Sequence, residues 1–172
     1  MPRHRSTREA VAAAWRSTEF AARDQGPGQD AQRVFVVGLD ASQLRGKGSH
    51  SSLHALAHAA RIARRQGARI VPVWVQPPIG LAETFAETVE TLVRERDERA
   101  DQARCAVKEA AGILGVGVGP LLVCDGDPFE QLCSIAGAVQ ADAIFVGASE
   151  HRMGSLAARL IRGAGRPVTV VP

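Results

Sequence analysis

The fold is decided by residues 142–172, which read DAIFVGASEHRMGSLAARLIRGAGRPVTVVP. An apolar run from Ala143 to Val146 ends at Gly147, and a short polar loop leads to Gly154-Ser155. An Ala-, Leu- and Arg-rich segment follows, and after it comes the β-branched run Val168 to Val171. This order predicts a strand, a loop, a helix and a strand, with the loop at the helix N-terminus. Free backbone N–H groups and the positive end of the helix dipole make such a junction suitable for binding a phosphate.

The preceding part of the chain alternates apolar runs with longer, more polar segments. Strands are predicted over residues 33–39, 68–75 and 116–124, and helices over residues 51–66, 81–113 and 127–140. Asp127 is the expected N-cap of the third of these helices, with Pro128 at its first position. Pro72, inside the second strand, requires that its missing hydrogen-bond donor face an edge or a bulge. The alternation predicts an α/β fold, a five-stranded parallel sheet with helices on both faces.

The composition indicates one domain that follows a short extension. The chain has 172 residues, of which 45% are hydrophobic and 23% charged, as in globular proteins of ordinary size. Residues 1–32 contain a potential short helix and a Gly- and Pro-containing linker, and residues 33–172 form the domain. We interpret the extension as a frayed or loosely docked segment. A partner-binding or membrane-surface helix is the alternative.

Several functional classes are disfavoured by the composition. The formal net charge of only +3 is weak evidence for a nucleic-acid partner, because affinity for nucleic acid needs a clustered basic face. Aromatic residues make up only 4%, so stacking platforms for nucleic acid are missing. No apolar run approaches the ~20 residues that span a bilayer, and no secretory signal is recognisable, which predicts a cytoplasmic protein without a membrane partner. Cys105, Cys124 and Cys133 are interpreted as reduced thiols, because they lack C-x-x-C pairing and metal-ligand spacing.

Two local motifs resemble binding sites but have simpler interpretations. The loop after the first strand contains Gly-Lys-Gly-Ser, yet a P-loop requires Ser or Thr directly after the lysine, and a glycine follows Lys47. We interpret this loop as flexible, with a phosphate contact by Lys47 as the lesser alternative. His54 and His58 have the i, i+4 spacing of a metal site. Arg61 and Arg65 continue the same stripe, so a solvated basic face is favoured over a metal site.

Two of the predicted strands end in chemistry suited to a nucleotide. Asp40 follows the first strand, and Gly147 opens the loop after the fourth. Ligands of open parallel sheets bind at the carboxyl ends of strands, where the winding reverses. If these strands are neighbours, a carboxylate for ribose or adenine donors faces a helix N-terminus for phosphate. The alternatives are a turn-capping role for Asp40 and an ordinary N-cap at Ser155.

Over residues 33–172 the chain resembles the universal stress protein family. The resemblance rests on VVGLDAS, SLHALAHAARIARRQGARIVPVWV, CDGDPFEQL and VGASEHRMGSLAARLIRGAGRPVTVVP. It implies a Rossmann-like sheet of the adenine nucleotide alpha hydrolase type with strand order 3-2-1-4-5. It also implies binding of ATP or AMP, with Mg²⁺ only if ATP is bound. Carried over residue by residue, the nucleotide-binding positions are Asp40 for the nucleoside, Val73 or Val75 for adenine, and Gly147, Gly154 and Ser155 for the phosphates.

The glycine loop departs from the family pattern Gly-x2-Gly-x9-Gly-Ser/Thr. Only six residues separate Gly147 from Gly154, and Glu150 stands where the middle glycine belongs. A shorter loop has fewer N–H donors, and a carboxylate repels phosphate. We therefore expect any nucleotide to be held mainly through adenine and ribose.

Two functions follow from these observations. The first is a regulatory protein of the stress response that binds an adenine nucleotide, and the alternative is a nucleotide-free dimeric interaction module. The resemblance implies a homodimer formed through Val168 to Val171, which would be an exposed edge strand. No general base and no common hydrolase motif is identifiable, so no catalytic residue is assigned and at most weak ATP hydrolysis is expected.

Overall fold

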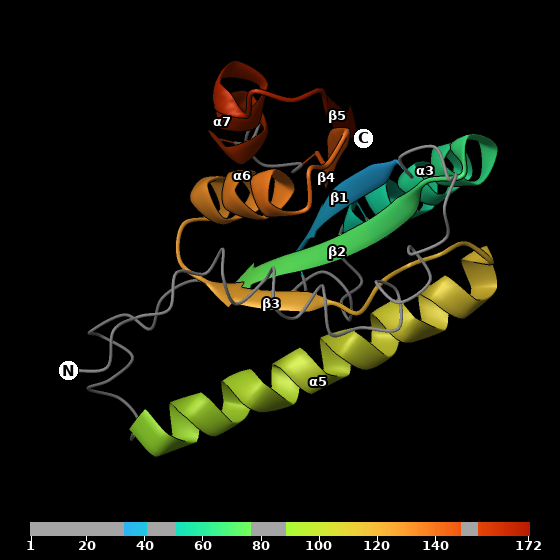
Figure 1. Cartoon of the computed structure of the whole chain (residues 1–172). Helices are drawn as coiled ribbons and strands as arrows, with labels where there is room; N and C mark the ends of the chain where they lie inside the picture. The colour runs from blue at the N-terminus through green and yellow to red at the C-terminus, as the bar shows by residue number, and fades with distance from the viewer. Residues whose placement is uncertain (1–32, 41–50, 77–88, 149–154) are drawn as a thin grey trace.

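The computed structural model describes residues 33–40, 51–76, 89–148 and 155–172. The predictions made for residues 1–32, Lys47, Glu150 and Gly154 fall outside the described residues. The strands are β1 (Val34–Leu39), β2 (Arg69–Gln76), β3 (Leu122–Asp125), β4 (Ala143–Gly147) and β5 (Val168–Val171). The helices among the described residues are α3 (Ser51–Gln66), α5 (Val89–Leu114), α6 (Pro128–Ala138) and α7 (Ser155–Gly163) (Figure 1).

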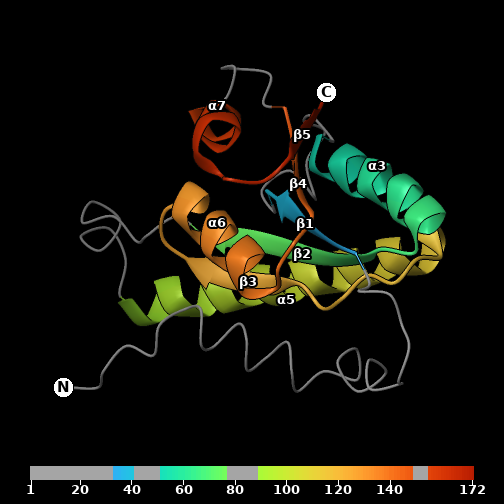
Figure 2. The ribbon, with the colours of Figure 1, turned by 45° about the horizontal axis from the view of Figure 1, so that its top comes forward.

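All neighbouring strands of the sheet run parallel, in the order β3-β2-β1-β4-β5, as predicted. The chain winds outward from β1 through β2 to β3, crosses back to β4 on the other side of β1, and continues to β5 at the far edge. Helices α3 and α5 lie on one face of the sheet, and α6 and α7 on the other (Figures 1 and 2). The reversal of winding therefore falls between β1 and β4.

The sheet is buried on both faces, which explains why its strands read as nearly continuous apolar runs. Alternate residues of β1 point to opposite sides. Phe35 and Val37 join the core beneath α3 and α5, whereas Val36 joins the core beneath α6 and α7. Phe35 packs against Phe145 of β4 with ring centroids 5.2 Å apart. The core is otherwise mostly aliphatic, as the low aromatic content requires.

Pro72 lies in β2, between β1 and β3, without costing a hydrogen bond of the ladder. The N–H of Ile70 donates to the carbonyl of Gly117 on the β3 side (2.9 Å). Because N–H groups alternate in direction along a strand, the nitrogen of Pro72 faces the same side. Pairing on that side is interrupted between the isolated Ile70–Val118 bridge and the ladder that begins at Leu122. The missing donor thus faces a gap in the sheet, as the sequence requires.

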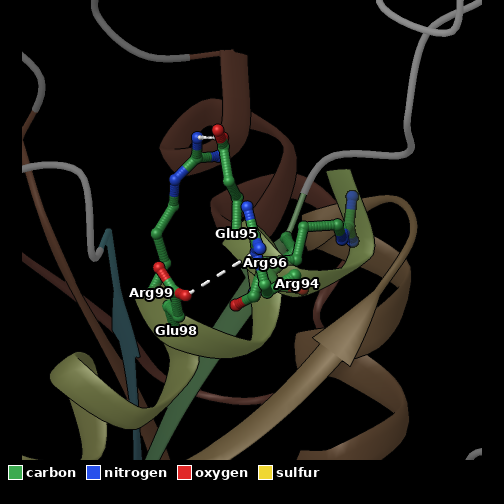
Figure 3. Close-up of polar contacts among 6 residues, drawn as sticks. Arg94, Glu95, Arg96, Glu98 and Arg99 are labelled. Atoms are coloured by element: carbon green, nitrogen blue, oxygen red, sulfur yellow. Dashed lines mark hydrogen bonds and ion pairs between the residues drawn. The ribbon is translucent and has the colours of Figure 1, made fainter. Parts of the chain in front are cut away.

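Helix α5 is long but only lightly buried. It spans 26 residues, and its buried residues are small: Ala100, Ala103 and Val107. Along its exposed side Arg94 pairs with Glu98 and Arg99 with Glu95, each at i, i+4 spacing (Figure 3). Exposed pairs of this kind contribute at most about 0.5 kcal/mol each. No helix among the described residues combines the length and the apolar character needed to cross a bilayer.

Candidate functional site

The carboxyl ends of β1 and β4 meet at one edge of the sheet, which brings Asp40 and Gly147 together as predicted. Gly38 pairs with Val146, so continuing the register places Asp40 level with Ala148. Asp40 is exposed, and its backbone N–H donates to Oγ of Ser52 (2.9 Å). The start of α3 is thereby tied to the end of β1.

Gly147 has a structural role that the sequence did not reveal. Helix α3 begins directly against it, and Ser51 at the start of α3 is only 4% exposed. A Cβ atom on Gly147 would lie 2.6 Å from the carbonyl carbon of Ser51 and 2.7 Å from its oxygen. Real Cβ atoms essentially never approach other atoms this closely. Gly147 is therefore required by the packing of a helix start against a strand end, whatever it contributes to a ligand.

The two valines proposed to contact adenine occupy different depths in β2. Val73 pairs with Gly38 and is 1% exposed, inside the core beneath α6. Val75 lies on the same face but one residue beyond Trp74, which pairs with Leu39 at the end of β1. It is partly exposed at the rim, level with Asp40. Of the two, Val75 is therefore the one nearer the carboxyl ends of the strands and the more exposed.

The remaining predicted residues belong to the loop that leaves β4. The N–H of Ala148 donates to the carbonyl of Val171 (2.6 Å), so the hydrogen bonding between β4 and β5 continues as far as Ala148. Helix α7 begins at Ser155, as predicted, on the same face as α6. Gly154 and the loop before it lie outside the described residues.

Asp127 makes two contacts near the carboxyl ends of the strands, and the sequence predicted only the first of them. Asp127 caps α6, and its Oδ1 accepts the N–H of Glu130 (3.1 Å), as the sequence indicated. Both carboxylate oxygens also accept hydrogen bonds from Arg159 of α7, at 2.8 and 2.9 Å. The hydrogen bond from Arg159 and the one from Glu130 lower the pKa of Asp127 below its usual value, and the pKa of Arg159 is raised. Both groups are therefore charged at neutral pH.

The aromatic ring of Phe129 completes this contact between the two helices. The guanidinium of Arg159 lies over the ring, 4.7 Å from its centroid. One turn further along α7, a Cβ atom on Gly163 would lie 3.0 Å from Cζ of Phe129. The i, i+4 spacing of Arg159 and Gly163 would have allowed us to infer that both lie on one face of α7. It would not have shown that this face packs against α6.

The described part of the chain contains no group of three or more His, Cys, Asp or Glu that could hold a metal. Nδ1 of His58 lies 3.2 Å from Nη2 of Arg61. Burial, with a smaller effect of Asp125, raises the pKa of Cys124 to about 11, so this thiol stays protonated. Arg96 of α5 pairs with Asp125 at the end of β3.

The fold defines an α/β protein of the doubly wound class, in which the winding reverses between β1 and β4. The universal stress protein family model matches residues 32–172, and the chain belongs to that family. Among curated proteins no sequence relative is found.

Several solved structures of universal stress proteins share this fold. A universal stress protein family member from Burkholderia pseudomallei is 29% identical, and the match covers 81% of this chain and 95% of that chain with a TM-score of 0.60. The universal stress protein from Archaeoglobus fulgidus, solved in complex with dAMP, is 25% identical over 84% of this chain and 100% of that chain, with a TM-score of 0.53. A family protein from Arabidopsis thaliana with AMP bound is 19% identical, covers 81% and 90% of the two chains, and shares the fold with a TM-score of 0.59.

The contact of Gly147 with Ser51 leads to a prediction about stability. Replacing Gly147 by alanine should destabilise the protein by about 1–3 kcal/mol or more, because the new methyl group meets backbone atoms that cannot move aside. Gly112→Ala in α5 is the matched control, since a Cβ there meets nothing within 4 Å. It should stabilise the protein by up to about 1 kcal/mol through helix propensity. Urea unfolding measures both, and equal effects of the two substitutions would contradict the packing role of Gly147.

Proposed function

We propose that this protein is a cytoplasmic regulatory member of the universal stress protein family that binds an adenine nucleotide in the crevice between β1 and β4. The main support for this proposal is the position of two residues at the ends of neighbouring strands, where the winding of the sheet reverses. The exposed carboxylate of Asp40 follows β1, and the close-packed Gly147 ends β4. The dAMP and AMP complexes of family members from Archaeoglobus fulgidus and Arabidopsis thaliana support the choice of ligand.

The described residues fit the nucleoside part of such a ligand. The carboxylate of Asp40 would accept hydrogen bonds from ribose hydroxyls or the adenine amine. Val75, at the rim of β2, offers an apolar surface for the base. The backbone at the start of α7 would supply N–H donors for the first phosphate. Mg²⁺ would accompany only ATP, where adjacent phosphates provide oxygen ligands.

Asp40 is the first residue to test. Asp40→Ala should weaken binding of adenine nucleotides by about 1–3 kcal/mol, because donors of the nucleoside would be left unpaired. Asp125→Ala removes a carboxylate from the same edge two strands away and should leave the affinity unchanged. Isothermal titration of AMP against the three proteins makes the comparison. Unchanged affinity in Asp40→Ala would leave Asp40 with a role in capping the strand end alone.

The short loop predicts how affinity depends on the number of phosphates. AMP, ADP and ATP should bind with similar affinity, because few donors are available beyond the first phosphate. Glu150→Gly should favour ATP selectively, since it removes a repulsive charge and allows a positive φ. Titration of the three nucleotides against both proteins tests this. A preference of the unmodified protein for ATP over AMP of about tenfold, roughly 1.4 kcal/mol, would show that the loop still binds all the phosphates.

The open edge of β5 favours a second function, a homodimeric interaction module that does not require nucleotide. Among the described strands, β5 pairs only with β4. The carbonyl of Pro167 accepts a hydrogen bond from Ile144 of β4, and the carbonyl of Val171 accepts one from Ala148, directly after β4. Because backbone groups alternate in direction, those of Val168 and Val170 face the open edge. An edge with unpaired donors and β-branched side chains is a surface on which a second copy can add.

Removing one outward donor tests this assembly. Val170→Pro eliminates an N–H on the open edge and should shift the protein from dimer to monomer in sedimentation at micromolar concentration. Val170→Ala, which shortens the side chain but keeps the N–H, should remain dimeric. A monomeric unmodified protein, or a dimer indifferent to Val170→Pro, would exclude assembly through β5.

A further inference from the structure

Helix α7 is short and only partly buried. It spans nine residues. Leu160 is fully buried, but the next residue, Ile161, is 65% exposed. Leu156 and Ala157 are only partly buried against the core. A helix of this length has little intrinsic stability in water, so its position depends on tertiary contacts.

A contact with the N-terminus of α6 adds a second attachment to this limited burial. Arg159 binds Asp127 through two hydrogen bonds of 2.8 and 2.9 Å, a bidentate geometry that fixes both distance and orientation. The guanidinium also covers the ring of Phe129. Gly163, one turn later, lets α7 approach the edge of the same ring. We call Asp127, Phe129, Arg159 and Gly163 the α6–α7 lock.

The lock acts on the N-terminal end of α7. Arg159 lies one turn after Ser155, where α7 begins. Side chains of a helix lean toward its N-terminus, so the guanidinium reaches back along the first turn. Its partner Asp127 is itself held in place as the N-cap of α6, two residues after the end of β3. The first turn of α7 is thus connected to a rigid point of the sheet edge.

We propose that Arg159 and Asp127 are positioning residues that fix the start of α7 at the carboxyl edge of the sheet, and with it the end of the crevice that receives the first phosphate. The ligand part of this inference rests on the proposed nucleotide site. The nucleoside end is built from β1, β2, β4 and α3 and does not involve the lock. Loss of the lock should therefore affect AMP and spare adenosine.

Three variants separate the elements of the lock. Arg159→Met removes the ion pair, Arg159→Lys keeps the charge but loses the bidentate geometry, and Asp127→Asn keeps an N-cap acceptor but loses the charge. Arg166→Met is the matched control. Arg166 follows α7 and donates to the carbonyl of Ala141, which lies before β4 at the amino ends of the strands. Calorimetric titrations with adenosine and AMP are combined with hydrogen exchange of the α7 amides.

Arg159→Met and Asp127→Asn should weaken AMP binding about tenfold and change adenosine binding less than twofold. Arg159→Lys should fall between these variants and the unmodified protein, and Arg166→Met should keep the original ratio of the two affinities. Amides of α7 should exchange faster in Arg159→Met while those of β1 and β4 stay protected. Should Arg159→Met fail to fold, Arg159→Lys and Asp127→Asn carry the same comparison.

Two results would overturn the inference. One is an unchanged ratio of AMP to adenosine affinity in both Arg159→Met and Asp127→Asn. The other is unchanged exchange of the α7 amides. If the unmodified protein binds neither adenosine nor AMP, the proposed nucleotide function fails instead. Hydrogen exchange then decides the lock alone: faster exchange confined to α7 supports it and unchanged exchange excludes it.

Discussion

The architecture depends on a close approach of two backbones, the start of α3 and the end of β4. A single Cβ on Gly147 would lie within 2.6 Å of Ser51. Because α3 follows β1 and β4 pairs with β1, this approach occurs at the reversal of winding. The next residue of α3, Ser52, accepts a hydrogen bond from the N–H of Asp40. The arrangement of Asp40 and Gly147 at this edge is therefore a consequence of how the sheet reverses.

The sequence predicted the order of helices and strands because hydrophobic periodicity and the Gly and Pro residues that end elements are local properties. α3 at Ser51–Gln66 and β5 at Val168–Val171 agree with the prediction to the residue. β3 was predicted over residues 116–124, best defined from Leu121 on, and it begins at Leu122. The run Gly-Val-Gly-Pro before Leu121 contains too few side chains and donors to continue a ladder, and only the isolated Ile70–Val118 bridge forms there. Strand order required the family resemblance in addition, since periodicity does not specify neighbours.

Contacts between elements were the part that local patterns could not give. Asp127 was recognised as an N-cap because its partner lies three residues away, whereas Arg159 lies 32 residues away on another helix. Whether an arginine of α7 reaches it depends on the angle at which α6 and α7 cross. The choice between Val73 and Val75 depends likewise on where β2 ends relative to β1. These are facts of packing, and burial rather than propensity decides them.

The proposed nucleotide site has two parts that differ in how they are supported. The proposed nucleoside end would stand on three strands of the sheet and on the buried start of α3, so little ordering would be needed when a ligand binds there. The proposed phosphate end would stand on α7, which is tied to α6 through Asp127 and Arg159. A nucleoside end built from the core would give a constant preference for the base. A phosphate end carried by a separately anchored helix can be altered without disturbing that core. Changes in phosphate recognition within this fold are therefore expected to arise on α7 and its lock rather than in the sheet.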